Sequence, residues 1–165
     1  METETPFDPR HDVVERLAFA RQLFTADVMS MTHDQLLSTH GGVSRNGYDF
    51  LYELVGFFDT FAGLMSKSNR EIEGPQGGWV KAPSEFCDRE SACVAMSAAA
   101  DRFVSALQNY NGDYIRDSYD SPVGPFTPLS MANLAVWHLM YHSGQLNYIQ
   151  TIDGDADFHW IPEGM

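Results

Sequence analysis

Apolar residues recur at helical spacing in four long segments of the chain, and capping or turn residues bound each segment. The first opens at Asp8-Pro9, an N-cap followed by proline at the first helical position, and Thr127-Pro128 opens the last in the same way. Glycine-rich stretches separate the first segment from the second, and Gly154 ends the fourth. In chain order, the predicted helices cover residues 9–30, 48–66, 84 or 88 to 108, and 127 to 154, with a short helical turn from Thr32.

The connections between these helices are rich in glycine and proline. Residues 73–83, EGPQGGWVKAP, predict a loop, and residues 111–126, NGDYIRDSYDSPVGPF, predict a longer connector between the third and fourth helices. We expect this connector to be the longest irregular segment. Four helices of such length around one core predict an all-α, up-down four-helix bundle that forms a single domain over residues 1–165.

Charge excludes several classes of partner. Acidic residues outnumber basic ones by 23 to 10, which gives a net charge of −13, and no window is rich in Lys or Arg. Nucleic acids and anionic membranes both require a positive surface, so we expect neither as a partner. The polar N-terminus METETPFDPRHD and the lack of a long apolar run predict a cytoplasmic protein. Cys87 and Cys93 are expected to be reduced, small core residues.

Polar residues interrupt the apolar stripe of the fourth helix. His138 and His142 lie four residues apart on one face, within the stripe formed by Met131, Leu134, Ala135, His138, His142, Gln145 and Ile149. A buried imidazole needs a hydrogen bond or a ligand, and the i, i+4 spacing can present two nitrogens to one metal ion. Two hydrogen-bonded core histidines are the alternative interpretation, which the spacing alone leaves equally open.

The second predicted helix offers a third ligand. Glu53 lies within the apolar stripe of Phe50, Leu54, Phe57, Phe61 and Leu64. A carboxylate there is costly to bury alone but natural opposite a divalent cation. The alternatives are that Glu53 is hydrated or pairs with Arg45. The metal interpretation is favoured, with Asp49 as a supporting residue or an alternative ligand.

Gln145 follows His142 by three residues on nearly the same face. An amide oxygen binds zinc poorly compared with histidine, so Gln145 is predicted to support His142 by a hydrogen bond rather than to bind the metal.

Residues 127–155, TPLSMANLAVWHLMYHSGQLNYIQTIDGD, resemble the last helix of the DinB-like (YfiT-like) helical-bundle proteins. The signature of that family, His-x-x-x-His-x-Gly-Gln, is met by His138, His142, Gly144 and Gln145. The resemblance implies a bundle in which three side chains hold a divalent metal, commonly zinc or nickel, at one end of the helices. It also implies a thiol-dependent transferase or hydrolase as the class of enzyme, with an unknown small molecule or low-molecular-weight thiol as substrate.

The chain departs from that family in the second helix, where the usual third ligand is a histidine. NGYDFLYELVGFFDTF contains none; Glu53 falls near the expected position, and Gly56 is the competing alignment, which would leave the metal site incomplete. A site of Glu53, His138 and His142 would keep a fourth coordination position open, as in catalytic zinc sites.

The remaining candidates are assigned to surface or packing roles. The other histidines are His11, His33, His40 and His159, of which His40 is the nearest to a possible site because a glycine-rich loop follows it. The aromatic residues Trp137, Tyr141 and Tyr148 are most simply explained by helix packing, and the alternative is that they line a bundle mouth and stack on a substrate. Trp79 and Lys81 are candidates to cover such a mouth. The tail with Trp160 is expected to fold back on the bundle.

Two classes of function remain open, a metalloenzyme and a non-catalytic, dimeric helical-bundle binding or stress-related protein with an incomplete metal site. Apolar residues are spread widely around the first two long helices, as in LAFARQLF and FLYELVGFF. A face that stays apolar after the bundle forms usually marks an interface, so we expect a homodimer.

Overall fold

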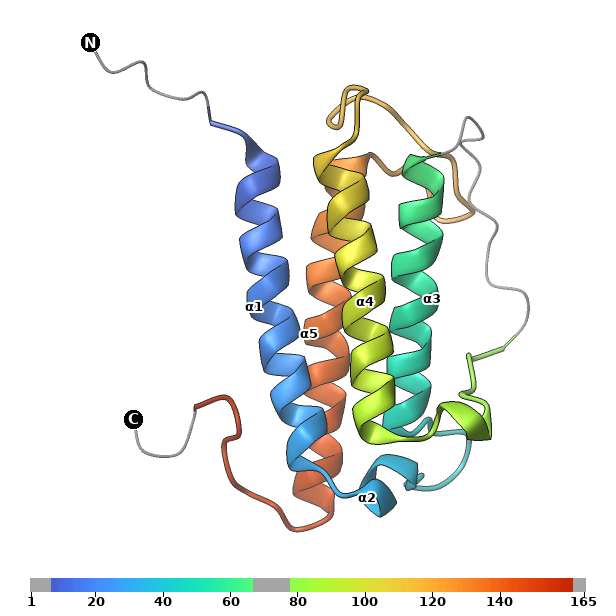
Figure 1. The fold of residues 1–165 in the computed structure, drawn as a ribbon. Helices are drawn as coiled ribbons and strands as arrows, with labels where there is room; N and C mark the ends of the chain where they lie inside the picture. The colour runs from blue at the N-terminus through green and yellow to red at the C-terminus, as the bar shows by residue number, and fades with distance from the viewer. Residues whose placement is uncertain (1–6, 67–77, 162–165) are drawn as a thin grey trace.

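Four long α-helices build the protein, which is described here by a computed structural model over residues 7–66 and 78–161. They are α1 (Pro9–Ser30), α3 (Gly47–Met65), α4 (Arg89–Gln108) and α5 (Pro128–Ile152), with the short helices α2 (His33–Leu37) and η1 (Ser84–Phe86) between them (Figure 1). The described residues include one isolated β-bridge, between Tyr119 and Phe126, and no strand. The predicted all-α four-helix bundle is therefore confirmed.

Side-chain caps start each long helix where the sequence predicts it. The Asp8 carboxylate accepts a hydrogen bond from the Arg10 amide at the start of α1, and Asp88, rather than Ser84, caps α4. Reciprocal capping boxes start α3, at Asn46, and α5, at Thr127. These caps explain why the helix bounds could be predicted closely.

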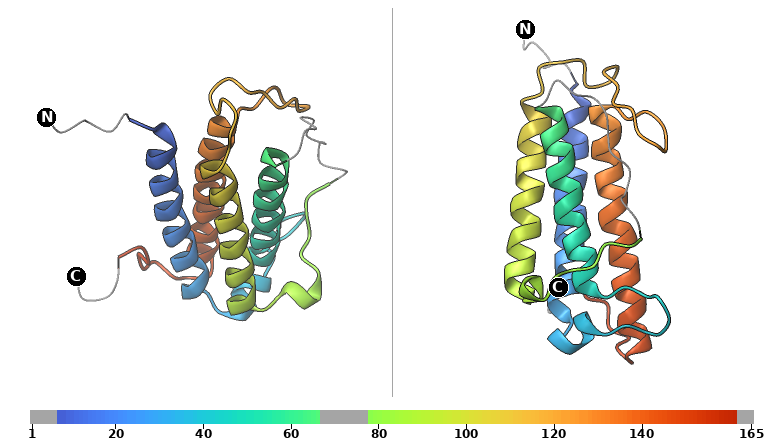
Figure 2. Two further views of the ribbon diagram at one scale, coloured as in Figure 1. Left: turned by 45° about the horizontal axis from the view of Figure 1, so that its top comes forward. Right: turned by 90° about the vertical axis from the view of Figure 1, so that its right-hand side faces the viewer.

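The directions of the helices differ from the predicted up-down order, which is wrong. Figures 1 and 2 show that α3 and α4 run the same way, while α1 and α5 both run the opposite way. Side-chain contacts support these directions, because they join residues at similar distances from the starts of the two helices. Arg102 of α4 pairs with Asp59 of α3, and Arg16 of α1 donates to Asn133 of α5. The end of α3 and the start of α4 therefore lie at opposite ends of the bundle.

Within the described residues the longest stretch without a helix is 109–127, between α4 and α5, as predicted. The connection between α3 and α4 contains η1 and lies partly outside the described residues. Much of the loop predicted over 73–83 lies outside the described residues, and residues 78–83 contain no helix.

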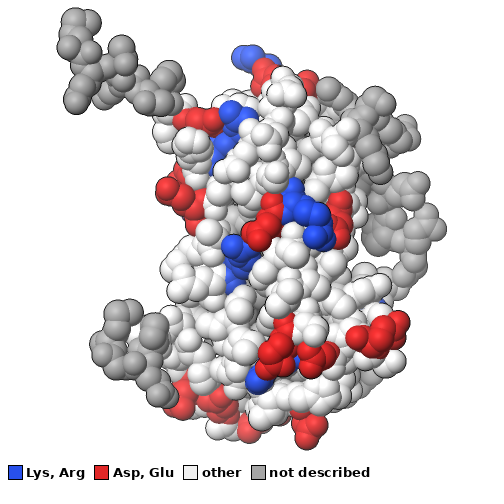
Figure 3. All heavy atoms as spheres, viewed as in Figure 1, with Lys and Arg blue, Asp and Glu red and all other residues white. Residues whose placement is uncertain are grey.

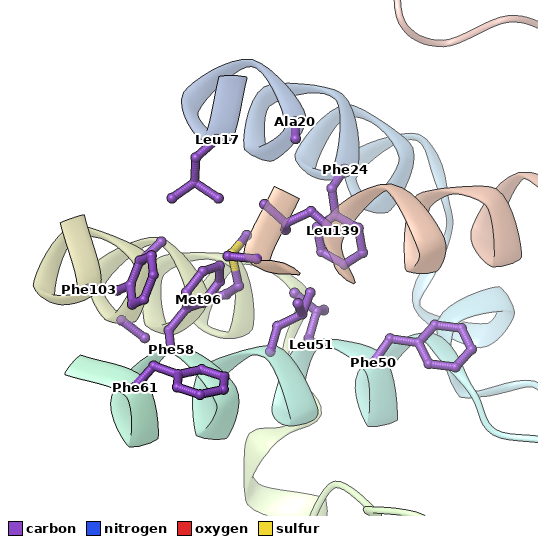
Figure 4. Packing of buried hydrophobic residues seen from close by; sticks show 14 of the residues in the cluster. Leu17, Ala20, Phe24, Phe50, Leu51, Phe58, Phe61, Met96, Phe103 and Leu139 are labelled. Carbon is purple, nitrogen blue, oxygen red and sulfur yellow. The ribbon is translucent and has the colours of Figure 1, made fainter. Parts of the chain in front are cut away.

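The core lies between the four long helices, and each of them contributes large side chains to it (Figure 4). Cys93 is buried within this cluster and Cys87 is half-buried against it, and both thiols are free, as predicted. Burial raises the pKa of the Cys93 thiol to about 11, so it stays protonated and unreactive at neutral pH.

Acidic side chains accompany the basic ones on the face formed by α1 and α4 (Figure 3). Arg21 bonds Asp101 across these helices at 2.5 Å, and Arg102 bonds Asp59 at 2.8 Å. Such exposed pairs contribute little to stability, because water and salt screen the two charges. No helix in the described parts of the chain is both long enough and apolar enough to span a membrane.

A buried aspartate joins the C-terminal tail to the bundle, which confirms the predicted return of the tail. Asp27 of α1 is fully buried and accepts hydrogen bonds from the Ser143 hydroxyl and, at 2.8 Å, from the Trp160 indole nitrogen. Burial raises the pKa of the Asp27 carboxyl, and the hydrogen bonds from Ser143 and Trp160 only partly oppose this effect.

We expect the stability of the protein to fall, relative to that of Asp27→Asn, as the pH rises from 4 to 7. The raised pKa means that the native state binds more protons at Asp27 than the unfolded state does, and this advantage is lost as the carboxyl ionises. Asparagine does not titrate. Urea unfolding midpoints across this range measure the effect, with the exposed Asp101→Asn as control. Parallel profiles for the parent and Asp27→Asn would contradict it.

Candidate metal centre

Three potential metal ligands meet between α3 and α5. Glu53 extends from α3, and His138 and His142 extend from successive turns of α5, which runs antiparallel to α3. One ligand atom from each lies within 4.8 Å of the others. The structure thus brings together the residues that the sequence singled out.

Both imidazoles face the same carboxylate. The Nε2 atom of His142 lies 3.3 Å from Oε2 of Glu53, and the Nε2 atom of His138 lies 3.8 Å from Oε1. Phe50 stacks on the ring of His142 with centroids 4.7 Å apart, and Phe57 meets the ring of His138 edge-on at 4.7 Å. These two phenylalanines of α3 fix the ring planes, so the nitrogens need little rearrangement to share one ion.

Gln145 determines the tautomer of His142, and therefore makes the nitrogen that faces the Glu53 carboxylate an acceptor. Its amide nitrogen donates to the Tyr141 hydroxyl at 3.2 Å, which leaves its oxygen 2.7 Å from Nδ1 of His142. An oxygen there requires a proton on Nδ1, so the lone pair of the neutral ring lies on Nε2. This is the supporting hydrogen bond that the sequence predicted for Gln145.

The Nε2 atom of His142 is the one buried side-chain nitrogen or oxygen in the described residues that lacks a hydrogen-bond partner. An unsatisfied buried polar group costs roughly 1–3 kcal/mol. Here its lone pair also faces a carboxylate oxygen, so the arrangement calls for a positive charge between the two atoms. A metal ion or a proton on Nε2 would supply it.

Glu53 is ionised and pairs with Arg45, so the ion pair that the sequence offered as an alternative to metal binding is also present. Burial opposes ionisation of Glu53, but the neighbouring His142 and the hydrogen bond and charge of Arg45 outweigh it and lower the pKa of Glu53 to about 2. Oε2 accepts a hydrogen bond from Arg45 Nη1, so an ion pair and a ligand role compete for, or share, one carboxylate.

His138 is neutral at physiological pH. Burial, followed by the neighbouring His142, lowers the pKa of His138 to about 4 despite the opposing charge of Glu53. A neutral imidazole has a free lone pair, which is the form that binds metals. Metal binding at pH 7 would therefore require no deprotonation of Glu53 or His138.

Asp49 makes its contacts elsewhere. Its carboxylate accepts hydrogen bonds from the Asn46 amide at 3.1 Å, the Ala82 amide at 2.8 Å and the Lys81 ammonium at 2.8 Å. It is not part of the three-residue group. Asp49 instead ties residues 78–82 to the start of α3, which positions Trp79 at the mouth of a cavity beside the centre.

Two cavities flank the centre. The larger, of about 590 Å³, is lined by Arg45, Phe50, Trp79, Tyr141, Gln145 and Tyr148 among others, and the smaller, of about 320 Å³, is lined by Phe57, Leu134, Trp137, His138 and Tyr141. The prediction that Trp137, Tyr141 and Tyr148 pack between helices is wrong, because all three are more than half exposed. Helical periodicity cannot reveal which side of an uncharged helix faces solvent.

The other histidines lie outside the three-residue group. His11 is exposed, His33 contacts the Tyr48 hydroxyl at 2.8 Å and His159 contacts Asp155 at 2.9 Å, as expected for surface and packing residues. The Nε2 atom of His40 lies 3.7 Å from Oδ1 of Asp153, and His40 lines the larger cavity. This agrees with the expectation that His40 is the nearest of these histidines to a possible site.

Comparison with known proteins supports the fold and gives no sequence relative. No protein-family model matches the chain, and no curated protein matches its sequence. A solved structure of YfiT from Bacillus subtilis superposes with a TM-score of 0.68 over 93% of each chain, at 12% sequence identity. YfiT is described as a probable metal-dependent hydrolase with an unusual four-helix bundle topology. The YfiT-like fold suggested by the histidine motif is thereby confirmed.

We expect Gln145→Leu to weaken metal binding by roughly ten- to a hundredfold, as losses of ligand-supporting hydrogen bonds usually do. Without the amide oxygen, nothing in the described surroundings fixes the proton of His142 on Nδ1. Titration with zinc measures the loss, and Asp49→Asn is the control, because Asp49 contacts α3 and the 78–82 segment rather than a histidine. An unchanged affinity in Gln145→Leu would contradict the supporting role.

Proposed function

We propose that the protein is a divalent-metal-dependent enzyme of the DinB-like kind, a hydrolase or thiol-dependent transferase whose metal is held by Glu53, His138 and His142. The observation that carries the proposal is the buried Nε2 of His142, which lacks a partner and faces the Glu53 carboxylate. Zinc and nickel are the expected metals, because both accept imidazole nitrogen and carboxylate oxygen.

The donor set suits a catalytic site better than a purely structural one. Structural zinc sites are usually closed by four protein ligands, whereas three ligands leave one position for water or substrate. A bound zinc-like ion supplies the chemistry of lowering the pKa of a water or thiol at that position. The chain itself holds the carboxylate with Arg45 and fixes the His142 tautomer with Gln145.

A non-catalytic bundle is the second candidate, and the ion pair between Glu53 and Arg45 favours it. A proton on Nε2 of His142 would complete a hydrogen-bonded network of histidine, glutamate and arginine without any metal. In that case Asp49 and Gln145 would serve only stability.

Metal content separates the two candidates. We propose mass spectrometry on protein purified without a histidine tag or nickel column, followed by titration of chelator-treated protein with zinc and nickel. About one divalent ion per chain, or submicromolar affinity on titration, supports the enzyme. If no divalent ion binds at micromolar concentration, the enzyme proposal fails and the network of Glu53, Arg45 and His142 is structural.

We further propose a homodimer in the cytoplasm. Phe19 of α1 is 62% exposed, and Trp137 of α5 is also largely exposed, so apolar surface remains after the bundle forms. We expect light scattering to give the mass of two chains at micromolar concentration. A monomer mass across a wide concentration range would contradict the dimer.

A further inference from the structure

Arg45 lies between two aromatic rings at the wall of the larger cavity. The carbon at the centre of its guanidinium is 4.5 Å from the centroid of the Trp79 ring and 5.0 Å from that of Phe50, and its side chain is 7% exposed. A guanidinium held between aromatic faces keeps a fixed plane and directs its N–H groups outward along its edge.

Most hydrogen-bonding capacity of Arg45 is not used by the described residues. A guanidinium has five N–H donors, and the one bond recorded for Arg45 within residues 7–66 and 78–161 runs from Nη1 to Glu53. None of its other nitrogens is among the buried, unpartnered side-chain atoms of these residues, and Arg45 lines the larger cavity. This edge can bind a carboxylate through two hydrogen bonds.

The rest of the cavity suits a flat apolar body. Trp79, Tyr141 and Tyr148 form aromatic walls, and Ile149 and Ile152 add aliphatic surface. A volume of about 590 Å³ lies within the range of roughly 300–1,000 Å³ that holds small ligands. Arg45 is the permanently charged cation among the lining residues, which favours a ligand with a single carboxylate.

The cavity also borders the candidate metal centre. Phe50 and Gln145 line it and contact the ring of His142, and Arg45 lines it and pairs with Glu53. A divalent ion on Glu53 would neutralise part of the negative charge that Arg45 otherwise neutralises, and would leave more of the positive charge of Arg45 for a bound anion. Metal and anion should therefore strengthen each other's binding.

We propose that the larger cavity binds a small monocarboxylate with a flat apolar or aromatic body, whose carboxylate is received by Arg45 between Trp79 and Phe50. The proposal names a substrate class for the proposed enzyme and rests on that function for its catalytic meaning. Binding itself requires only the cavity and Arg45, so it can be tested without metal.

The experiment compares indole-3-acetate with its neutral analogue indole-3-acetamide by isothermal titration calorimetry on chelator-treated protein, and then on the same protein loaded with zinc. A hydrogen-bonded charge pair contributes roughly 1.5–3 kcal/mol, so we expect the acetate to bind at least about tenfold more tightly than the amide. Zinc should tighten the acetate further.

Two tryptophan variants locate the ligand. Trp79→Leu removes one face of the Arg45 sandwich and one cavity wall, and we expect it to weaken acetate binding by roughly threefold or more. Trp137→Leu is the matched control, because Trp137 is similarly exposed but lies outside this cavity. Arg45→Lys retains the charge without the planar fork, and it should reduce the preference for acetate over amide.

The outcomes separate this proposal from the proposed function. Equal binding of acetate and amide, or no effect of Trp79→Leu, would overturn the carboxylate site. Acetate binding that requires zinc and ignores Trp79→Leu would place the carboxylate on the metal, which overturns this proposal and leaves the metalloenzyme intact. A preference for acetate in protein that binds no metal would support the site and refute the enzyme.

Discussion

His142→Ala is expected to abolish tight binding of zinc. The variant deletes the nitrogen that is both buried and unpartnered in the described residues, and it leaves Glu53 and His138 as two ligands of one ion. Losing a supporting hydrogen bond costs roughly ten- to a hundredfold in metal affinity, so losing a ligand should cost more than about a hundredfold.

Stability against heat gives a second readout of the same loss. At a thousandfold excess over Kd, a ligand that binds only the native state stabilises it by about 4 kcal/mol. For a chain of this size that is a rise in Tm of roughly 10 °C, which zinc should produce in the parent and not in His142→Ala.

His138→Ala provides a milder version of the test. Its side chain is 17% exposed, whereas that of His142 is fully buried, so the smaller substitution cost should leave the fold intact. His11→Ala, on the exposed face of α1, is the matched control for histidine removal. If either ligand variant binds zinc as tightly as the parent and shows the same rise in Tm, the proposed centre is wrong.

The helices could be predicted because their signals are local. Asp8, Asn46, Asp88 and Thr127 each bond an amide within three residues, so the start of every long helix is written in a few positions. The order in which the helices run is not local. It depends on the chain between α3 and α4, where glycine and proline indicate a loop but not the distance that the loop must span.

The candidate site was predictable to the same extent. The spacing of His138 and His142, and the position of Glu53 in an apolar stripe, depend only on helical geometry, and the structure brings these residues together. The surroundings could not be predicted, because they depend on how loops meet. Asp49 points to Lys81 and Ala82, and Arg45 reaches Glu53 from the segment before α3.

Glu53 therefore participates in two interactions that the sequence presented as alternatives. Its Oε2 accepts from Arg45 and also lies 3.3 Å from Nε2 of His142. A carboxylate has about four lone-pair positions, so it can keep the arginine while one lone pair binds a metal. If a metal binds, Arg45 orients the ligand; if none does, Arg45 is its principal partner.

Glu53→Gln should separate these two roles, since it preserves size and hydrogen-bonding capacity while it removes the charge. We expect zinc affinity to fall by more than about a hundredfold, because the amide oxygen is a much poorer ligand than a carboxylate whose pKa is about 2. The metal-free variant should lose roughly 1–3 kcal/mol in urea unfolding, because the buried Arg45 then lacks a counter-charge. Glu53→Gln with Arg45→Met should recover part of that stability but none of the zinc affinity. If Glu53→Gln loses stability yet binds zinc as before, Glu53 is only the partner of Arg45 and His138 and His142 bind the ion without it.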